Sequence, residues 1–196
     1  MGKGAETKER ILEQAVGLAS RDGLDGLSIG GLATELGLSK SGLFAHFGSK
    51  EELQLQVLQA AVERFREVVV RPGLAAPRGE PRIRVFFERW LDWDAGRSLP
   101  GGCILIAAAT ELDDRPGPQR ELLVRAQRDW FDALAKAARI AVEEGHFRAD
   151  LDAEQFAFQL YGIVLGYHHS KRLLRDPRAP EHARGAYQRL IDSVRP

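Results

Sequence analysis

Apolar residues recur every three or four positions along most of the chain, which is the spacing of one face of an α-helix. No segment has the strict alternation of apolar and polar residues, bounded by turn pairs, that is typical of a half-buried strand. The pattern therefore predicts an all-α fold of about nine helices. These are expected over residues 7–22, 29–36, 40–47, 50–70, 81–94, 102–112, 118–144, 152–174 and 181–194.

The ends of the first helices carry clear local signals. Ser28, Ser39 and Ser49 stand where N-caps of the second, third and fourth helices are expected. Gly23 and Gly37 stand where the first and second helices end, because glycine adopts the left-handed conformation that closes a helix. The sequence thus predicts a first helix, two short capped helices and a long fourth one.

A loop is expected from Arg71 to Pro81, where three Pro and two Gly fall within eleven residues. We find no internal repeat and no low-complexity tract, so a solenoid is not expected. We predict a helix-turn-helix head over residues 1–52 and a larger helical body over residues 53–196.

Composition narrows the class of protein. The chain has 196 residues, of which 44% are hydrophobic and 29% charged, and it has no apolar run of 18 residues, so a soluble globular protein without membrane spans is expected. Basic and acidic residues number 28 each, so any surface that binds nucleic acid must be local. The single Cys103 excludes an internal disulfide and fits a cytoplasmic protein, as does the absence of a secretory signal.

The segment Ile29–Leu43 has the arrangement that a helix-turn-helix requires. Ala33 is small where the two helices cross, Gly37 permits a tight turn, and Leu38 and Leu43 are expected to fill the angle between the helices. The same pattern also fits a plain helical hairpin. In a helix-turn-helix, the exposed residues of the third helix would face a DNA groove. These residues are Lys40, Ser41, Gly42, Phe44 and His46.

The stretch that follows favours the first interpretation. Leu43-Phe-Ala-His-Phe-Gly-Ser-Lys-Glu-Glu-Leu53 closely resembles the signature of the tetracycline-repressor (TetR) family. Together with Thr7–Leu36, the resemblance covers the first quarter to third of the chain, and the remainder is similar in size and helix layout. It implies a homodimeric transcription factor, most simply a repressor, that binds palindromic double-stranded operator DNA and is released by a small apolar effector, without a cofactor.

The resemblance assigns roles to individual residues. It implies that Phe44 lies against the DNA backbone or a thymine methyl group, although the family usually has Tyr there, so a phosphate-reaching hydroxyl is missing. His46 matches a phosphate-binding His, with an exposed or capping His as the alternative. Lys50 matches a Lys at a helix N-terminus, where phosphate is favoured. The expected DNA-binding residues are Ser28, Lys40, Ser41, Gly42, Phe44, His46 and Lys50.

The charge of the head is nearly balanced, since Met1–Arg71 holds nine basic and ten acidic residues. DNA affinity would therefore need a one-sided distribution of charge. Lys3, Lys8 and Arg10 could form a basic N-terminal arm, or they could be ordinary solubilising charges ahead of the first helix.

The body is rich in aromatic residues around the apolar stretch Gly101–Thr110. Core packing explains many of these residues. The resemblance implies a ligand cavity, and for its lining we expect Trp90, Trp93, Cys103, Ala107, Trp130 and Tyr161. Cys103 is open to two interpretations, a redox sensor or a small buried hydrophobe.

Enzyme and metal chemistry find no support in the sequence. No catalytic triad, paired carboxylate set or phosphate-binding loop stands at a meaningful spacing. His168 and His169 are adjacent on one helix, about 100 degrees apart, so they cannot bind one metal from the same face. We therefore expect a protein that is not an enzyme and holds no metal.

The last two helices are where the family dimerises. Gly162 and Gly166 lie four residues apart and permit close helix approach. Packing within one chain is the alternative use of this face. Apolar area is expected from Leu160, Ile163, Val164 and Tyr167. As a whole, the sequence also fits an architectural or partner-regulated DNA-binding protein without a functional pocket.

Overall fold

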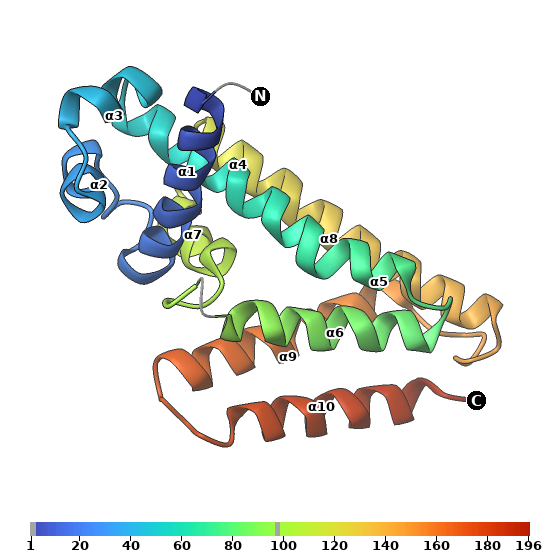
Figure 1. Ribbon diagram of the computed structural model, residues 1–196. Coiled ribbons are helices and arrows are strands. Elements are labelled where there is room, and N and C mark those ends of the chain that lie inside the picture. Colours follow the sequence, from blue (N-terminus) through green and yellow to red (C-terminus); the bar gives the residue numbers. More distant parts are fainter. Residues whose placement is uncertain (1–2, 97–98) are drawn as a thin grey trace. The chain divides into compact units, whose positions relative to one another are not determined.

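The computed structural model describes residues 3–96 and 99–196, and this part of the chain is mostly α-helical, without a β-strand (Figure 1). The all-α prediction is confirmed. None of the helices described could cross a membrane, because none is both long and apolar enough. In chain order the elements are α1 (Lys3–Asp22), α2 (Ile29–Leu36), α3 (Lys40–Phe47), α4 (Lys50–Phe65), the π-helical η1 (Arg66–Val70), α5 (Arg71–Ala75), α6 (Glu80–Ala95), α7 (Ile104–Leu112), α8 (Pro118–Glu143), α9 (Ala153–Arg172) and α10 (Ala179–Val194).

The fourth predicted helix runs further than expected. Helix α4, η1 and α5 follow one another without a gap, so the loop predicted from Arg71 was wrong over its first five residues. Pro72, which has no backbone N–H to donate, stands at the start of α5 directly after the π-helical η1, where the N–H of Arg71 donates to the carbonyl oxygen of Arg66. Gly73 is buried there, and a Cβ at this position would lie 2.0 Å from Cδ1 of Phe86. The glycine thus permits close packing and does not mark a loop.

The chain forms two compact units. Unit 1 comprises Met1–Arg64 and Ala95–Val124, and unit 2 comprises Phe65–Asp94 and Arg125–Pro196. The domain boundary after residue 52 stays a prediction. Helix α7, which comes from the middle of the chain, belongs to the same unit as α1, α2 and α3.

Unit 1 has a core of aliphatic side chains contributed by several helices. Ile11 and Ala15 of α1, Leu32 of α2 and Leu53 and Val57 of α4 are all buried. The segment before α7 also packs on α1. The N–H of Gly101 donates to Ser20 Oγ at 3.1 Å, and a Cβ on Gly101 would lie only 1.4 Å from the Ser20 carbonyl oxygen.

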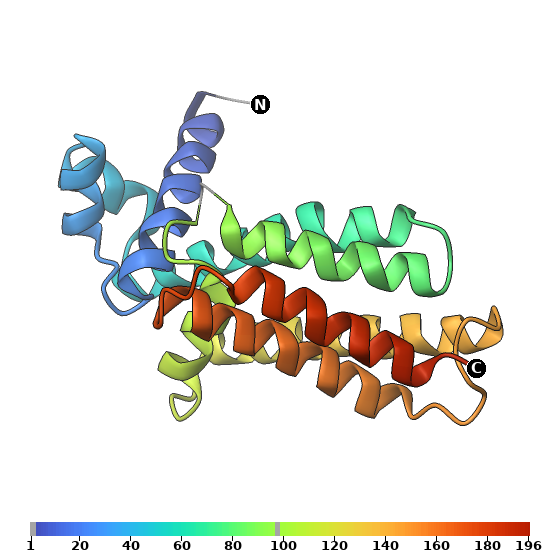
Figure 2. The same ribbon diagram turned by 90° about the horizontal axis from the view of Figure 1, so that it is seen from below.

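Unit 2 has a core dominated by aromatic rings. Phe87 of α6 stacks on Tyr187 of α10, with ring centroids 4.2 Å apart, and Trp90 meets Tyr167 of α9 edge to face at 6.2 Å. Helices α9 and α10 lie side by side and antiparallel (Figures 1 and 2).

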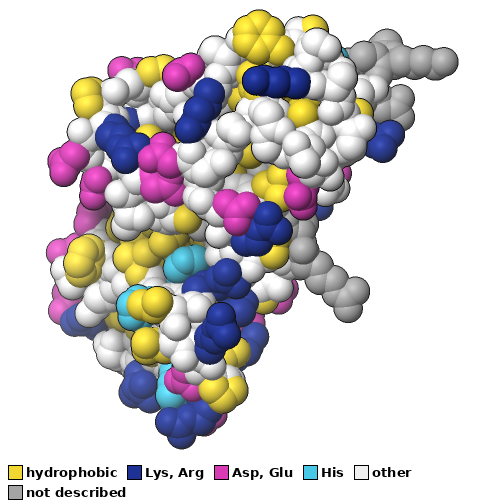
Figure 3. Space-filling model, turned by 90° about the vertical axis from the view of Figure 1, so that its left-hand side faces the viewer, with side chains coloured by type: hydrophobic (Ala, Val, Ile, Leu, Met, Phe, Trp, Pro, Cys, Tyr) yellow, Lys and Arg dark blue, Asp and Glu magenta, His cyan; other side chains and the backbone are white. Residues whose placement is uncertain are grey.

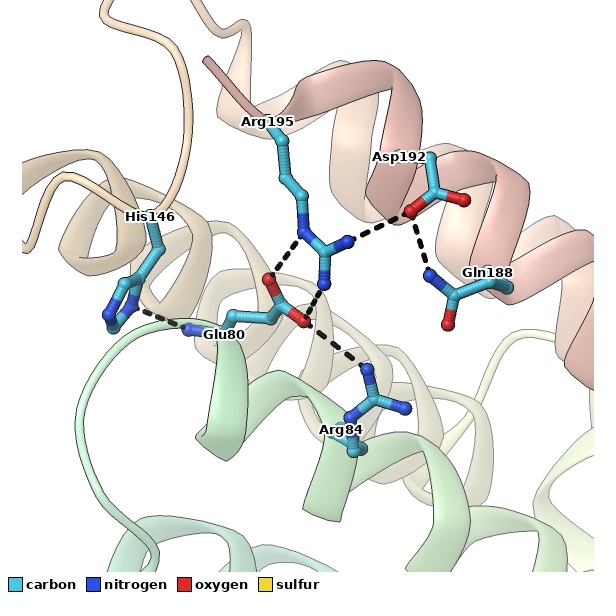
Figure 4. A network of polar contacts seen from close by, with 6 residues as sticks. All are labelled: Glu80, Arg84, His146, Gln188, Asp192 and Arg195. Carbon is cyan, nitrogen blue, oxygen red and sulfur yellow. Dashed lines mark hydrogen bonds and ion pairs between the residues drawn. The ribbon is translucent and has the colours of Figure 1, made fainter.

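A polar network joins the C-terminal end of the chain to the start of α6 (Figure 4). Both oxygens of Glu80 accept hydrogen bonds from Arg195, at 2.6 and 3.0 Å, and one also accepts from Arg84 at 3.2 Å. The backbone N–H of Glu80 donates to His146 Nδ1 at 3.2 Å. The hydrogen bonds from Arg195 hold the pKa of Glu80 below its ordinary value.

Candidate nucleic-acid interface

The helices α2 and α3 are each closed by their own caps. Ser28 Oγ accepts the N–H of Gly31 at 3.0 Å, and Ser39 Oγ accepts the N–H of Gly42 at 3.1 Å. Between them, Gly37 takes a φ of +64°, which glycine adopts without strain. These three local predictions are confirmed, and they fix the turn of a helix-turn-helix.

The packing between the two helices agrees with the prediction except at one residue. Ala33 and Leu43 are buried, as is Phe47. Leu38 was expected to fill the angle between the helices, but its side chain is 43% exposed. Its backbone serves the turn instead, because its N–H donates to the carbonyl oxygen of Ala33 at 2.9 Å and its side chain faces outward.

The outer face of α3 carries basic, small and apolar residues. Lys40, Ser41 and Gly42 are exposed, His46 is half-buried, and Phe44 is 55% exposed. No acidic residue occurs from 36 to 50. Lys and Arg side chains lie beside exposed hydrophobic ones in the upper part of Figure 3, the side of the molecule that carries α2 and α3. Such a helix can enter a major groove with its short residues near base edges.

Two further basic residues lie close to α3. Lys50 begins α4 and is exposed, and its Nζ donates to the carbonyl oxygen of Asp25 at 2.7 Å. Lys8 lies on α1, with its Nζ 5.5 Å from the centre of the Phe47 ring. From the sequence, Lys8 and Arg10 were expected in an N-terminal arm or as solubilising charges ahead of the first helix, but the structure places both within α1. The side chain of Lys3 lies outside the described residues.

Leu38 is the surface residue that sequence reasoning missed. It and Phe44 are the two exposed large hydrophobic residues of unit 1 among the described side chains. The aliphatic character of Leu38 suggested burial, and only the position of the turn reveals that it faces outward. Both residues offer apolar contact of the kind that thymine methyl groups make.

The residues predicted to line a ligand cavity are divided between the two units. Cys103 and Ala107 belong to unit 1, with Cys103 buried just before α7. Unit 2 holds the other four. Their role in ligand binding stays a prediction.

The indole rings of unit 2 are packed against other aromatic rings. Phe65 meets both Trp93 and Trp130 edge to face, at 5.8 and 5.2 Å between ring centroids. The buried Nε1 of Trp130 has no hydrogen-bond partner within the described ranges. The hydroxyl of Tyr161 is satisfied differently, because it donates to Gln127 Oε1 at 3.2 Å. Trp130 therefore offers a free donor that a bound acceptor would satisfy.

The two adjacent histidines of α9 lie in different environments. His168 Nδ1 lies 2.6 Å from Oδ1 of the fully buried Asp94, which Lys171 also approaches at 3.5 Å, while His169 is exposed. In the part of the chain that the structure describes, no three His, Cys, Asp or Glu residues are grouped as a metal site would require.

The exposed face of α9 differs from the one predicted. Leu160, Val164 and Tyr167 lie in the interior of unit 2 and so cannot supply apolar area to a partner, and Ile163 is half-buried. Exposed apolar area comes instead from Phe158 and Leu165. A Cβ on Gly162 or on Gly166 would meet nothing within 4 Å, so the glycine face is open.

Two families of known proteins match the chain. The family described as "Bacterial regulatory proteins, tetR family" matches residues 11–57, which include α2 and α3. The family described as "Tetracyclin repressor-like, C-terminal domain" matches residues 79–187, which is more than half of the chain.

Individual proteins are similar over most of the chain. The HTH-type transcriptional repressor AcnR of Corynebacterium jeikeium (strain K411) is 26% identical over 162 residues, which cover 83% of this chain and 79% of that protein. A TetR transcriptional regulator from Chloroflexus aurantiacus J-10-fl superimposes with a TM-score of 0.85 and 29% identity, covering 98% of this chain and 96% of that one. AibR, in complex with isovaleryl coenzyme A and operator DNA, superimposes with a TM-score of 0.71 and 23% identity, covering 94% and 96%, and is similar in fold.

Proposed function

Because the chain belongs to the tetracycline-repressor family of bacterial transcriptional regulators, we propose that it is a homodimeric repressor that binds palindromic operator DNA and is released by a small apolar effector. The outer face of α3 carries the proposal. Lys40, Ser41 and Phe44 are exposed on a helix whose opposite face is buried, so their side chains are free to contact DNA. Bacterial operators lie in the cytoplasm, where we place the protein.

Phosphate and base contacts have different sources in this proposal. Lys40, Lys50 and His46 supply positive or hydrogen-bonding groups for phosphates, which position the head on the duplex. Ser41 and Gly42 lie at the start of α3, where the side chains of a recognition helix reach base edges. Phe44 and Leu38 add apolar contact.

The DNA-binding claim is tested by fluorescence anisotropy with duplex DNA from upstream of the protein's own gene. We expect this DNA to bind at least about 1,000-fold more tightly than unrelated DNA of equal length at the same salt concentration. Equal affinity for both duplexes would contradict a sequence-specific regulator. Lys40→Ala, at an exposed position in the first turn of α3, is expected to weaken binding to both duplexes.

The dimer claim is supported by the open face of α9. Phe158 and Leu165 expose apolar area on this face. Gly162 and Gly166 lie on the same face and allow another helix to approach closely. A two-fold pairing of this face would present two copies of α3, as a palindromic operator requires.

The effector claim is supported by the aromatic core of unit 2. Trp130 has a buried, unpartnered N–H, which costs free energy in the unliganded protein. A small apolar molecule with one hydrogen-bond acceptor would satisfy this group and bury its own surface among aromatic rings. AibR, which has this fold, has been seen in complex with isovaleryl coenzyme A and operator DNA, so a protein of this fold can hold a small molecule.

Tryptophan fluorescence during titration with a panel of apolar carbonyl compounds tests the effector claim. A compound that binds should change the emission and lower operator affinity, and Trp130→Phe should weaken its binding while leaving operator binding unchanged. If no compound binds, the alternative gains support, namely an architectural or partner-regulated DNA-binding protein without a functional pocket.

A further inference from the structure

A carboxylate of α7 holds the loop between α1 and α2. Glu111 Oε1 accepts the backbone N–H of Leu24 at 3.1 Å, and Glu111 Oε2 accepts the N–H of Asp25 at 2.8 Å. All three residues belong to unit 1. Hydrogen bonds to a carboxylate are stronger than those to a neutral acceptor, so these two bonds attach the loop to α7.

The residue before the loop is shaped for this contact. Gly23 takes a φ of +81°, and a Cβ there would lie 2.6 Å from Glu111 Oε1. The conformation alone would suit the end of a helix. The close approach of the carboxylate is a second and separate reason for glycine at this position.

The carbonyl groups of the same two residues are also bonded. Gln54 Nε2, which is buried, donates to the carbonyl oxygen of Leu24 at 2.7 Å, and Lys50 Nζ donates to that of Asp25 at 2.7 Å. The guanidinium of Arg115 pairs with the Asp25 carboxylate. Helix α7 thus holds the N–H groups and α4 holds the carbonyl groups of one dipeptide.

We propose that Glu111 is a positioning residue for operator binding, which fixes the α1–α2 loop and so the placement of α2 and α3. The inference rests on the proposed function. The loop ends at Ser28, the cap of α2, and α2 packs on α3. Ala107, predicted to contact the effector, lies one turn before Glu111 on α7. A shift of α7 on effector binding would therefore reach the DNA-binding helices through this carboxylate.

The first test compares Glu111→Gln with wild type in operator binding over a range of salt concentrations. Glutamine has the size of glutamate, but it turns an NH₂ group toward one of the two amides. We expect about tenfold weaker binding, because apparent affinity falls with the fraction of heads in the competent arrangement. The salt slope should stay unchanged, since no phosphate contact is lost. Asp114→Asn, an exposed change of equal charge three residues away, should leave affinity unchanged.

The second test follows backbone amide hydrogen exchange in the free protein. In Glu111→Gln, exchange should accelerate at Leu24 and Asp25 and stay unchanged at Gly31 and Gly42, whose amides are capped by serines. Those two glycines also report that the head remains folded. Gly23→Ala, which places a methyl group where the carboxylate lies, should give the same changes.

The outcomes separate the two proposals. If wild type binds its operator and Glu111→Gln binds equally well, the positioning role is overturned and the proposed function stands. If exchange at Leu24 and Asp25 is the same in variant and wild type, the carboxylate does not hold the loop, and the inference is overturned as well. A wild type that binds no DNA overturns the proposed function together with the inference.

Discussion

The ammonium group of Lys50 donates a hydrogen bond to the carbonyl oxygen of Asp25 at 2.7 Å. The residue expected from the sequence to bind phosphate is therefore already part of the contacts that hold the α1–α2 loop. An ammonium group has three donors, so the bond to Asp25 leaves two for a phosphate. Lys50 can serve both the loop and the DNA.

Replacing Lys50 by Ala should weaken operator binding across sequences and flatten the salt slope by about one unit, because one phosphate contact is lost. The measurement is operator affinity as a function of salt for both proteins. A lower affinity with the wild-type slope would show that Lys50 acts through the loop alone. Unchanged affinity would exclude both roles.

Replacing Ser41 by Asn should change which operator is preferred, because Asn can bond the edge of adenine in the major groove. Selection from a random duplex library with each protein gives the preferred sequences. Identical sequences would contradict a base-reading role for this position. Gly42→Ala is the less specific change, since its Cβ would lie 2.9 Å from Ser39 Oγ and disturb the cap of α3.

Replacing Phe158 by Asp should convert a dimer into a monomer with little loss of protomer stability, because the side chain is 66% exposed in one chain. Light scattering should give twice 21.7 kDa for wild type and 21.7 kDa for the variant. Leu74→Asp, the same kind of change at a residue of α5 that is 54% exposed, is the matched control and should remain dimeric. A variant mass equal to that of wild type would refute dimerisation through this face.

Glu80 should make stability dependent on pH in the acid range. Its pKa is lowered in the folded protein by the hydrogen bonds from Arg195, so its ionised form stabilises the fold. This contribution is complete above the ordinary value of 4.5 and is lost as the pH falls through the lower folded value. Glu80→Gln should therefore lower the free energy of unfolding at pH 7, and the difference from wild type should shrink at about pH 3.

Denaturant unfolding of both proteins at the two pH values measures this difference directly. Glu154→Gln removes the exposed ion pair with Arg139 and should change stability little at either pH. A Glu80→Gln deficit that is equally large at both pH values would rule out ionisation of Glu80 as its cause.

Local features were predictable from the sequence because their causes lie within a few residues. The caps Ser28 and Ser39 and the turn at Gly37 each depend on neighbours three or four positions away. Of the α3 positions expected to be exposed, Lys40, Ser41, Gly42 and Phe44 are exposed, and His46 is half-buried. Among the first three helices, the boundary that differs from the prediction is the start of α1, which begins at Lys3 and not near Thr7.

Other features depend on residues far apart in the chain, and the sequence carries no local sign of them. Glu111 and Leu24 are 87 positions apart, and the acidic end of α7 looked like an ordinary helix terminus. The helix at Pro72 could not be predicted from neighbouring residues, because Gly73 serves there for close packing against Phe86 of α6. Val164 and Phe158 are both apolar residues of α9, and only the fold decides that the first is buried and the second exposed.

The most direct measurement is a hydroxyl-radical footprint of the protein on DNA from upstream of its own gene. A homodimer that inserts one α3 per half-site should protect two half-sites related by two-fold symmetry, with centres about 10–10.5 base pairs apart or a multiple of this spacing. Protection should disappear in Lys40→Ala at raised salt. A single asymmetric footprint, or none, would contradict a dimeric operator-binding regulator.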